Sequence, residues 1–311
     1  QISTGSYSGS ITFASTAELA DDGGSGWTTN FPGFIDEPKV YPYARDADEI
    51  KTDYIKGAGA HGESAVLGME DTSSLNDGLV GYWKMDEVSW GSAIDSSGNG
   101  NNGTVYGGMV PSAGKFGNGG VFDGAGDYIN AGNATSLDVD TFTVSSWIKT
   151  TGTGYKMWLA RGSGQYWLSH HTSRLHFCLT TSEGRTDLYA TVNYYDNKWH
   201  HVVNTYDGSY MKMYMDGIEI NSFAKTGTIS GLTDLLIGRY ASPDYEYTGS
   251  TDEVRIYNKA LSPKEVRDLY NWAPGPVGYW NFNENTGTST VYDRSGNGNN
   301  GTMNGSMTES D

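Results

Sequence analysis

One short motif has the composition of a metal-binding loop. Asp95 opens the stretch DSSGNGNNGT, and the string GNGNNGT occurs at residues 98–104 and again at residues 296–302. The Asp95 carboxylate, the amides of Asn99 and Asn101 and backbone carbonyls that glycines allow to turn inward are the oxygens that calcium takes as ligands. A loop that only forms a turn is the alternative, since Asn and Gly both tolerate left-handed backbone angles. The motif alone leaves both possibilities open.

Residue types used in catalysis are present, but their spacing is unfavourable. Glycoside hydrolysis needs two carboxylates beside one bond, and alternate positions of a strand would bring them to one face. The strand-like segments MWLARG, YWLSHH and LHFCLT contain no acidic residue. His170 and His171 are adjacent, so in a regular strand they point to opposite faces and cannot hold a metal together. His200 and His201 are interpreted as core or surface histidines. No Ser-His-Asp set is evident, and we expect no enzymatic activity.

A third group of residues could bind sugars, which stack on aromatic rings and hydrogen-bond to a few polar groups. The candidates are Tyr155, Trp158, Arg161, Tyr166, Trp167, Asn193 and Tyr194, with Gln165 and Arg174 beside them. The alternative is that these rings fill a hydrophobic core, which needs large aromatic side chains.

The elements that must position these residues are predicted to be short strands. The chain has 43 glycines, 22 tyrosines and 9 tryptophans among 311 residues, which favours strands joined by tight turns. Apolar and polar residues alternate in FTVSSWIK and MKMYMDG, and more than eight such runs lie between residues 78 and 273. This number predicts an all-β, two-sheet antiparallel jelly-roll sandwich. A short C-terminal helix is predicted in LSPKEVRDLY, with Ser262 as N-cap, Pro263 at the first position and Glu265 completing a capping box.

Charge and composition exclude several classes of partner. The net charge is -17, and no basic stripe exists that could bind the phosphates of a nucleic acid. No apolar run approaches the roughly 18 residues of a membrane span. The single cysteine, Cys178, permits no intrachain disulfide and is interpreted as a buried apolar side chain.

Internal repeats predict the domain organisation. GLVGYWKMDE at residues 78–87 matches GPVGYWNFNE at residues 275–284, and residues 33–58 match residues 249–273. We therefore expect four parts. They are the C-terminal part of a preceding unit (1–58), a linker (59–77), a complete unit (78–273) and the N-terminal part of a following unit (274–311).

Several motifs of the complete unit occur together in one known family. They are GYWxxDE, DxSGNGNxG, FDGxxDY at residues 122–128, KWHHV at residues 198–202 and DEVRIYNxALSxxEV at residues 252–266. In this order the chain resembles the LamG-like jelly roll (laminin G type 3) of the concanavalin A-like lectin and glucanase superfamily, in tandem repeats. The resemblance implies a convex and a concave sheet, with the sugar-binding candidates lining the concave side.

The same resemblance extends the calcium hypothesis to a second segment. It implies that the loop of Asp95 meets Asp252, at the start of the last strand, and that a structural Ca²⁺ ion clamps the first and last strands together. The ligands would be Asp95 and Asp252, completed by Asn99, Asn101 or nearby carbonyls. By the repeats, Asp36 corresponds to Asp252 and Asp293 corresponds to Asp95.

Three functions are consistent with the resemblance. The first is a non-catalytic protein outside the cell or on its surface, which binds glycans or neighbouring surface proteins in adhesion. The second is a structural subunit of an extracellular filament, self-associating through incomplete sandwich ends. The third is an accessory module of a secreted glycoside hydrolase.

Overall fold

The computed structural model describes residues 35, 38–41, 43–45, 50–51, 73–162, 165–230, 233–240, 245–272, 274, 276–280, 282, 290–295 and 298–302. Contacts divide the chain into a larger unit, Val40–Val277, and a smaller unit formed by Gln1–Lys39 with Gly278–Asp311. No helix in the described part is long and apolar enough to cross a lipid bilayer.

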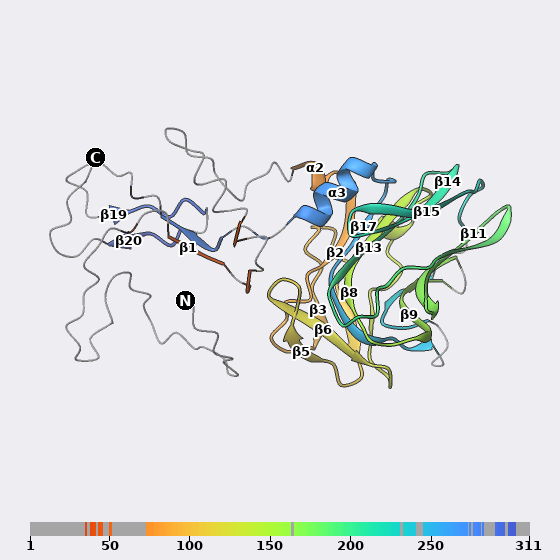
Figure 1. Cartoon of the computed structure of the whole chain (residues 1–311), viewed down its shortest axis with the longest axis horizontal. Coiled ribbons are helices and arrows are strands. Elements are labelled where there is room, and N and C mark those ends of the chain that lie inside the picture. Colours follow the sequence, from red (N-terminus) through yellow and green to blue (C-terminus); the bar gives the residue numbers. More distant parts are fainter. Residues whose placement is uncertain are drawn as a thin grey trace. The chain divides into compact units, whose positions relative to one another are not determined.

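The larger unit is an antiparallel β-sandwich of two sheets, as predicted (Figure 1). The strands of the first sheet, called here the β10 sheet, are in spatial order β12 (Gly184–Ala190), β11 (Arg174–Thr181), β10 (Tyr166–Thr172), β9 (Gly154–Arg161), β16 (Leu235–Ile237), β7 (Tyr128–Asn130), β4 (Gly103–Tyr106) and β3 (Ser92–Ala93). Those of the second, the β8 sheet, are β15 (Ile218–Ala224), β14 (Tyr210–Met215), β13 (His200–Tyr206), β8 (Phe142–Lys149), β17 (Thr248–Tyr257), β6 (Asn118–Asp123) and β5 (Val110–Ala113). The strand β2 (Leu79–Trp83) also pairs with β17.

Alternation of side chains builds the core between the sheets. In β10, Tyr166, Leu168 and His170 are fully buried, and the first two belong to the main hydrophobic cluster. In β8, Phe142, Val144 and Ile148 join the same cluster from the opposite sheet. Because successive side chains of a strand alternate, Trp167, Ser169 and His171 point to the outer face of the β10 sheet. His170 and His171 therefore lie on opposite faces, as the sequence predicted.

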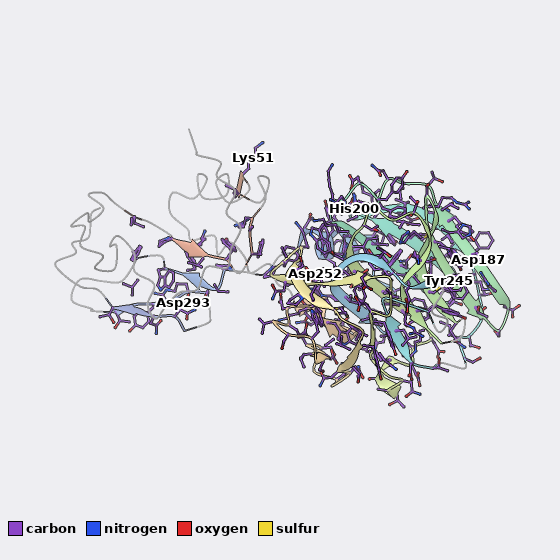
Figure 2. The ribbon with its side chains drawn as sticks, turned by 90° about the horizontal axis from the view of Figure 1, so that it is seen from below. Lys51, Asp187, His200, Tyr245, Asp252 and Asp293 are labelled. Carbon is purple, nitrogen blue, oxygen red and sulfur yellow. The ribbon has the colours of Figure 1, made fainter. Side chains whose placement is uncertain are left out.

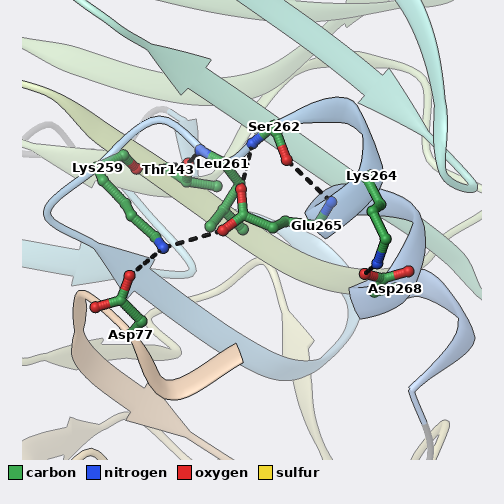
Figure 3. A network of polar contacts seen from close by, with 8 residues as sticks. All are labelled: Asp77, Thr143, Lys259, Leu261, Ser262, Lys264, Glu265 and Asp268. Atoms are coloured by element: carbon green, nitrogen blue, oxygen red, sulfur yellow. Dashed lines mark hydrogen bonds and ion pairs between the residues drawn. The ribbon is translucent and has the colours of Figure 1, made fainter. Parts of the chain in front are cut away.

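The predicted helix forms and is capped as predicted (Figure 3). The helix α3 (Pro263–Asn271) begins after Ser262, whose hydroxyl accepts the backbone N–H of Glu265, while the Glu265 carboxylate accepts the backbone N–H of Ser262 at 2.7 Å. Lys259 bridges Asp77 and Glu265 at 2.5 and 3.0 Å. Val266 and Leu269 bury the apolar face of α3 against a second cluster that includes Val203 and Tyr257 of the β8 sheet. The helix thus covers part of the outer face of that sheet.

The remaining described elements are short. They are β1 (Lys39–Val40), which pairs with β18 (Gly278–Tyr279), β19 (Thr290–Val291), which pairs with β20 (Gly301–Thr302), α2 (Ser73–Asn76) and the 3₁₀ helix η1 (Thr135–Leu137). The predicted tandem units, their boundaries and the filament built from them stay predictions.

Candidate functional site

The hydrogen bonds of Asp95 decide how its loop is held. The Asp95 carboxylate accepts the backbone N–H groups of Tyr82 and Ser97, both at 2.9 Å, and that of Asn101 at 2.8 Å. It also accepts the Ser97 hydroxyl at 2.9 Å. An ionised carboxylate has about four lone-pair positions, and all four meet protein donors here. Gly98 and Gly100 adopt φ angles of 88° and 76°, which let the chain turn around the carboxylate.

The amides proposed as further calcium ligands also have partners within the protein. The Asn101 amide donates to the Val80 carbonyl at 2.7 Å, and its oxygen accepts the Ser136 hydroxyl at 3.0 Å. Asn99 is exposed, and its amide nitrogen donates to the Leu79 carbonyl at 3.3 Å. Both asparagines therefore hold the loop against the strand β2 and its surroundings.

Asp252 lies in a separate set of hydrogen bonds. It is fully buried, and its carboxylate accepts the backbone N–H groups of Lys115, Phe116 and Glu253 at 2.7, 3.0 and 2.8 Å. Burial and the neighbouring charge of Glu253 raise its pKa well above the usual range of an aspartate. Across the described ranges, no group of three or more His, Cys, Asp or Glu side chains is arranged to hold a metal. Calcium binding stays a prediction, and this donor set does not fit it, whereas it fits a turn-forming loop. Asp36 lies outside the described residues.

The outer face of the β10 sheet carries the second candidate site. Met157, Ala160, Trp167 and Cys178 form a small apolar cluster there, separate from the main core. Half-buried tyrosines pack on this cluster from β9 and from the segment after β16. We call the layer of rings the outer-face platform, made of Tyr155, Trp167, His176, Tyr189, Tyr240 and Tyr245.

Ring contacts make the platform continuous. His176 and Tyr189 stack with centroids 4.4 Å apart and planes at 11°. Tyr155 meets Tyr245 edge to face at 5.0 Å, and Trp167 meets Tyr240 in the same way at 5.6 Å. Such packing fixes the rings without filling their outer surfaces, since Tyr155, Tyr189, Tyr240 and Tyr245 all keep part of their surface in solvent.

An ion pair stands beside the rings. Arg185 donates from Nε and Nη2 to the Asp187 carboxylate at 2.7–3.2 Å, and its guanidinium lies 4.6 Å from the centre of the Trp167 ring. The Arg185 side chain is 51% exposed. Burial raises the pKa of Asp187, but hydrogen bonds from Arg185 and His176 outweigh burial and lower it, so the carboxylate is ionised. Figure 2 shows Asp187 and Tyr245 on one flank of the sandwich and Asp252 on the other.

A hydrogen-bonded chain of serine, histidine and aspartate includes His176 of the platform. The Ser169 hydroxyl contacts Nδ1 of His176 at 2.9 Å, and Nε2 of His176 contacts Asp187 at 2.9 Å. This resembles the groups that activate a nucleophilic serine, but Ser169 is 0% exposed, so no substrate can reach its hydroxyl. Burial lowers the pKa of His176 to about 4, which keeps the imidazole neutral. These hydrogen bonds therefore orient Asp187 and the ring of His176.

The structure separates the predicted sugar-binding residues into two groups. Tyr155 and Trp167 lie in the platform, and Arg174 stands over its edge, 4.4 Å from the centre of the Tyr189 ring. Asn193 is exposed in the segment between β12 and β13, and Gln165 is half-buried before β10. Trp158, Tyr166 and Tyr194 instead lie in the main core, and Arg161 is fully buried, with Nη2 donating to Asp138 at 2.6 Å.

The placement of Trp158, Arg161, Tyr166 and Tyr194 argues against contact between these residues and a ligand. For Trp158 the reason is a β-bulge. Leu168 of β10 lies opposite Leu159, whereas the next residue, Ser169, lies opposite Met157. Trp158 is the extra residue, so it faces the core together with Leu159. Simple alternation along β9 could not predict this.

Most of the platform is assembled from residues that the sequence pattern did not single out. His176, Asp187 and Tyr189 are brought together by pairing, because His176 lies opposite both Ser169 and Tyr189, and Asp187 lies opposite Cys178. Alternation in RLHFCLTT and GRTDLYA was the available signal, but the second segment was not recognised as a strand. Tyr240 and Tyr245 lie outside strands, and no periodicity marks them.

Comparison with known families agrees with the fold. The family model described as the concanavalin A-like lectin/glucanases superfamily (Laminin_G_3) matches residues 123–267. Among curated proteins, adhesion G-protein coupled receptor V1 of Danio rerio is 25% identical over 145 residues, covering 42% of this chain and 2% of the receptor. Pappalysin-1 of Mus musculus is 27% identical over 172 residues, covering 47% of this chain and 10% of that protein. The chain thus spans a tenth or less of these relatives.

Two solved structures show the same architecture. The binding domain of Paraclostridial Mosquitocidal Protein 1 is 19% identical with a TM-score of 0.55, covering 63% of this chain and 52% of that one. Domain 4 of AbnA, a GH43 extracellular arabinanase from Geobacillus stearothermophilus solved with arabinotriose, is 23% identical with a TM-score of 0.51. The match covers 62% of this chain and 98% of that domain. At these identities the likeness establishes the fold.

Proposed function

We propose that the larger unit is a non-catalytic carbohydrate-binding module of an extracellular or cell-surface protein. The observation that carries the proposal is the outer-face platform beside the exposed pair of Arg185 and Asp187. A sugar ring has one face of C–H groups and a rim of hydroxyls. It needs an apolar surface with a few polar groups at the edge, which is the composition of a small-ligand site.

Each part of the platform would have a separate role. The exposed surfaces of Tyr155, Tyr189 and Tyr245 would contact the C–H face of the sugar. Asp187 would accept hydroxyl protons and Arg185 would donate to hydroxyl oxygens, and charged partners make such hydrogen bonds about twice as strong as neutral ones. The strands β9–β12 and the ring contacts hold these groups before a ligand arrives, which lowers the entropic cost of binding.

The non-catalytic assignment rests on the same residues. The one serine–histidine–aspartate chain identified among the described residues keeps its hydroxyl buried at Ser169. Glycoside hydrolysis needs two carboxylates flanking the bond, one of them protonated. Asp187 is ionised and paired with Arg185, which suits it to binding rather than to proton donation.

The comparisons support the proposal without extending it to a particular sugar. A domain of the same fold binds arabinotriose in an arabinanase, and another relative is an adhesion receptor. Both adhesion and an accessory role beside a glycosidase are compatible with a binding face of this kind.

A glycan array tests the proposal. We expect saturable binding to at least one glycan, reduced about tenfold in Tyr189→Ala and in Asp187→Asn. The matched control is Tyr210→Ala, because Tyr210 is 48% exposed on β14 of the other sheet, whereas the platform lies on the outer face of the β10 sheet. Circular dichroism would verify that all variants fold. An array on which no glycan is bound, or an equal loss of binding in Tyr210→Ala and Tyr189→Ala, would contradict the proposal.

A further inference from the structure

A hollow lies on the same outer face, beyond the platform. It encloses about 380 Å³ and is lined by Tyr128 and Asn130 of β7, Leu236 of β16, and Thr233, Asp234 and Arg239 next to β16. These side chains include an aromatic ring and both signs of charge, as at the platform with its neighbouring Arg185–Asp187 pair, and they add the amide of Asn130. The residues that line this hollow have no role in the function proposed above.

The rings and charges of this hollow are ordered by direct contacts. Tyr106 of β4 stacks on Tyr128 with centroids 4.5 Å apart and planes at 4°. The Arg239 guanidinium lies 4.3 Å from the centre of the Tyr128 ring. The Asn130 amide donates to Asp234 at 2.8 Å, and Tyr106 keeps 43% of its surface exposed. An open ring surface therefore stands beside fixed hydrogen-bonding groups.

The register of the sheet joins the hollow to the platform. Trp167 lies opposite Ala160, Ala160 lies opposite Leu236, and Leu236 lies opposite Asn130. Residues opposite one another in a ladder point to the same face, so these four side chains form one row across four strands. Asp187 extends the row at the platform end, because it lies opposite Cys178, which lies opposite Trp167. Tyr240, which touches Trp167, directly follows Arg239 in the chain.

We propose that the hollow is a second subsite for the same ligand, so that the β10 sheet binds an extended, uncharged glycan laid across its strands. This rests on the proposed function of the platform. Five strand spacings separate Asp187 from Asn130, about 24 Å, which a single sugar cannot span and a linear oligosaccharide can. Arg239 and Asp234 both line the hollow, and Arg185 pairs with Asp187 at the platform end. Neither sign of charge dominates, so the surface favours hydroxyl groups over an ionised sugar.

The chain length of the ligand is the quantity to vary. Linear arabino-, xylo-, manno- and cello-oligosaccharides, each from the monosaccharide to the hexasaccharide, would be titrated calorimetrically into the full chain. We expect affinity in one series to rise at least tenfold between the disaccharide and the hexasaccharide. Tyr106→Ala should remove most of that gain while leaving disaccharide affinity unchanged, because an aromatic contact is worth up to about tenfold in affinity.

A second variant fills the hollow instead of truncating it. Thr233 is exposed at its rim, so Thr233→Trp should block the subsite without disturbing the core, with the same selective loss for long chains. Tyr210→Ala again serves as the matched control. Binding that is independent of chain length, or unaffected by both variants, overturns the second subsite and leaves the platform standing. Binding on the array only to charged or branched glycans would also overturn the second subsite and leave the platform standing. Absence of any glycan binding overturns the platform and the subsite together.

Discussion

The two copies of the asparagine–glycine loop form the same hydrogen bonds in two different units. Each central aspartate, Asp95 or Asp293, accepts three backbone N–H groups and one serine hydroxyl. The backbone donors are Tyr82, Ser97 and Asn101 in the first copy, and Tyr279, Ser295 and Asn299 in the second. The equivalent tryptophans, Trp83 and Trp280, donate their indole N–H to a loop carbonyl at 3.0 and 2.9 Å.

The copies differ in burial. Trp83 is 0% exposed and belongs to the main core, whereas Trp280 is half-buried. Asn101 is buried and its counterpart Asn299 is exposed. The local sequence therefore determines the loop conformation wherever it occurs, while the surrounding fold determines how much stability depends on it. Substitutions made at equivalent positions of the two copies test this difference.

The largest difference from a single substitution is expected at the tryptophans. Trp83→Ala should destabilise the sandwich by about 4 kcal/mol, because it opens a cavity between two packed sheets. Trp280→Ala should leave the unfolding of the sandwich unchanged and speed amide exchange only at Ser295 and Asn299. Urea unfolding of the full chain, followed by hydrogen–deuterium exchange, measures both effects. Equal losses in the two variants would show that burial does not distinguish the copies.

A difference of similar size is expected in how the stability of the two units depends on pH. Burial lowers the pKa of His170 and His176 to about 4 and that of His201 to about 3, all in the sandwich. The unfolded chain binds protons at these histidines below pH 6.5, whereas the folded chain does so only near pH 4. Their stabilisation is therefore complete above pH 6.5 and is lost as the pH falls.

For these three histidines the expected loss between pH 7 and pH 5 is about 5 kcal/mol in total. A hydrogen bond to Asp216 raises the pKa of His200 despite its partial burial, so this residue contributes in the opposite direction at low pH. Thermal unfolding across this range measures the sum, and His176→Gln should make the fall shallower. The smaller unit contains no histidine, so the protection of its amides, corrected for the intrinsic pH dependence of exchange, should not respond. A melting temperature that is constant or rises toward pH 5 would refute the expectation.

The next smaller difference is expected when the central aspartates are replaced. Asp95→Ala removes one acceptor from four donors in the sandwich and should cost about 3 kcal/mol, since hydrogen bonds to a charged group are worth about 1.5–3 kcal/mol each and do not add fully. Asp293 is half-buried where Asp95 is buried, and its donor Asn299 is exposed, so Asp293→Ala should open only its own loop. Denaturant midpoints of the two variants, set beside Asp207→Ala as an exposed control, measure the contrast. A loss in Asp293→Ala as large as that in Asp95→Ala would remove the distinction.

A smaller effect is expected at the glycines before the tryptophans. A Cβ atom on Gly81 would lie 2.6 Å from the ring of Trp83, and one on Gly278 would lie 2.5 Å from the ring of Trp280. The enclosed ring of Trp83 cannot move aside, so Gly81→Ala should cost about 2 kcal/mol, as overpacking does. The half-buried ring of Trp280 can turn away. Thermal melts of Gly81→Ala and Gly278→Ala measure the two costs. An unchanged melting temperature in Gly81→Ala would mean that the core around Trp83 can rearrange to accept the added methyl group.

The smallest effect is expected from calcium. If both loops are held by hydrogen bonds alone, neither millimolar calcium nor a chelator should shift the melting temperature or the exchange of either loop. Differential scanning calorimetry with and without calcium measures this. A rise that requires Asp95 would instead establish the metal site predicted from the motif.

The sequence predicted the sandwich and the helix α3 because their signals are local. Alternation in FTVSSWIK defined β8, and Ser262, Pro263 and Glu265 defined the start of α3. The candidate site was predicted only at Tyr155, Trp167 and Arg174. A sheet face is assembled from strands whose pairing register a linear pattern does not contain. The bulge at Trp158 shows the consequence, since one extra residue turned a predicted ligand contact into a core residue.

By itself, the sequence indicated most of the strands through alternation and determined the capped helix and the conformation of both asparagine–glycine loops. Hydrogen bonds between residues close in the chain hold the helix cap and the loops. Tertiary structure decided which aromatic rings are enclosed and which face solvent. It also brought Ser169, His176 and Asp187 into one hydrogen-bonded chain and aligned Asp187 with Asn130 along one row. Those relations depend on strand register and on the second sheet, which covers one face of the β10 sheet and leaves the other open.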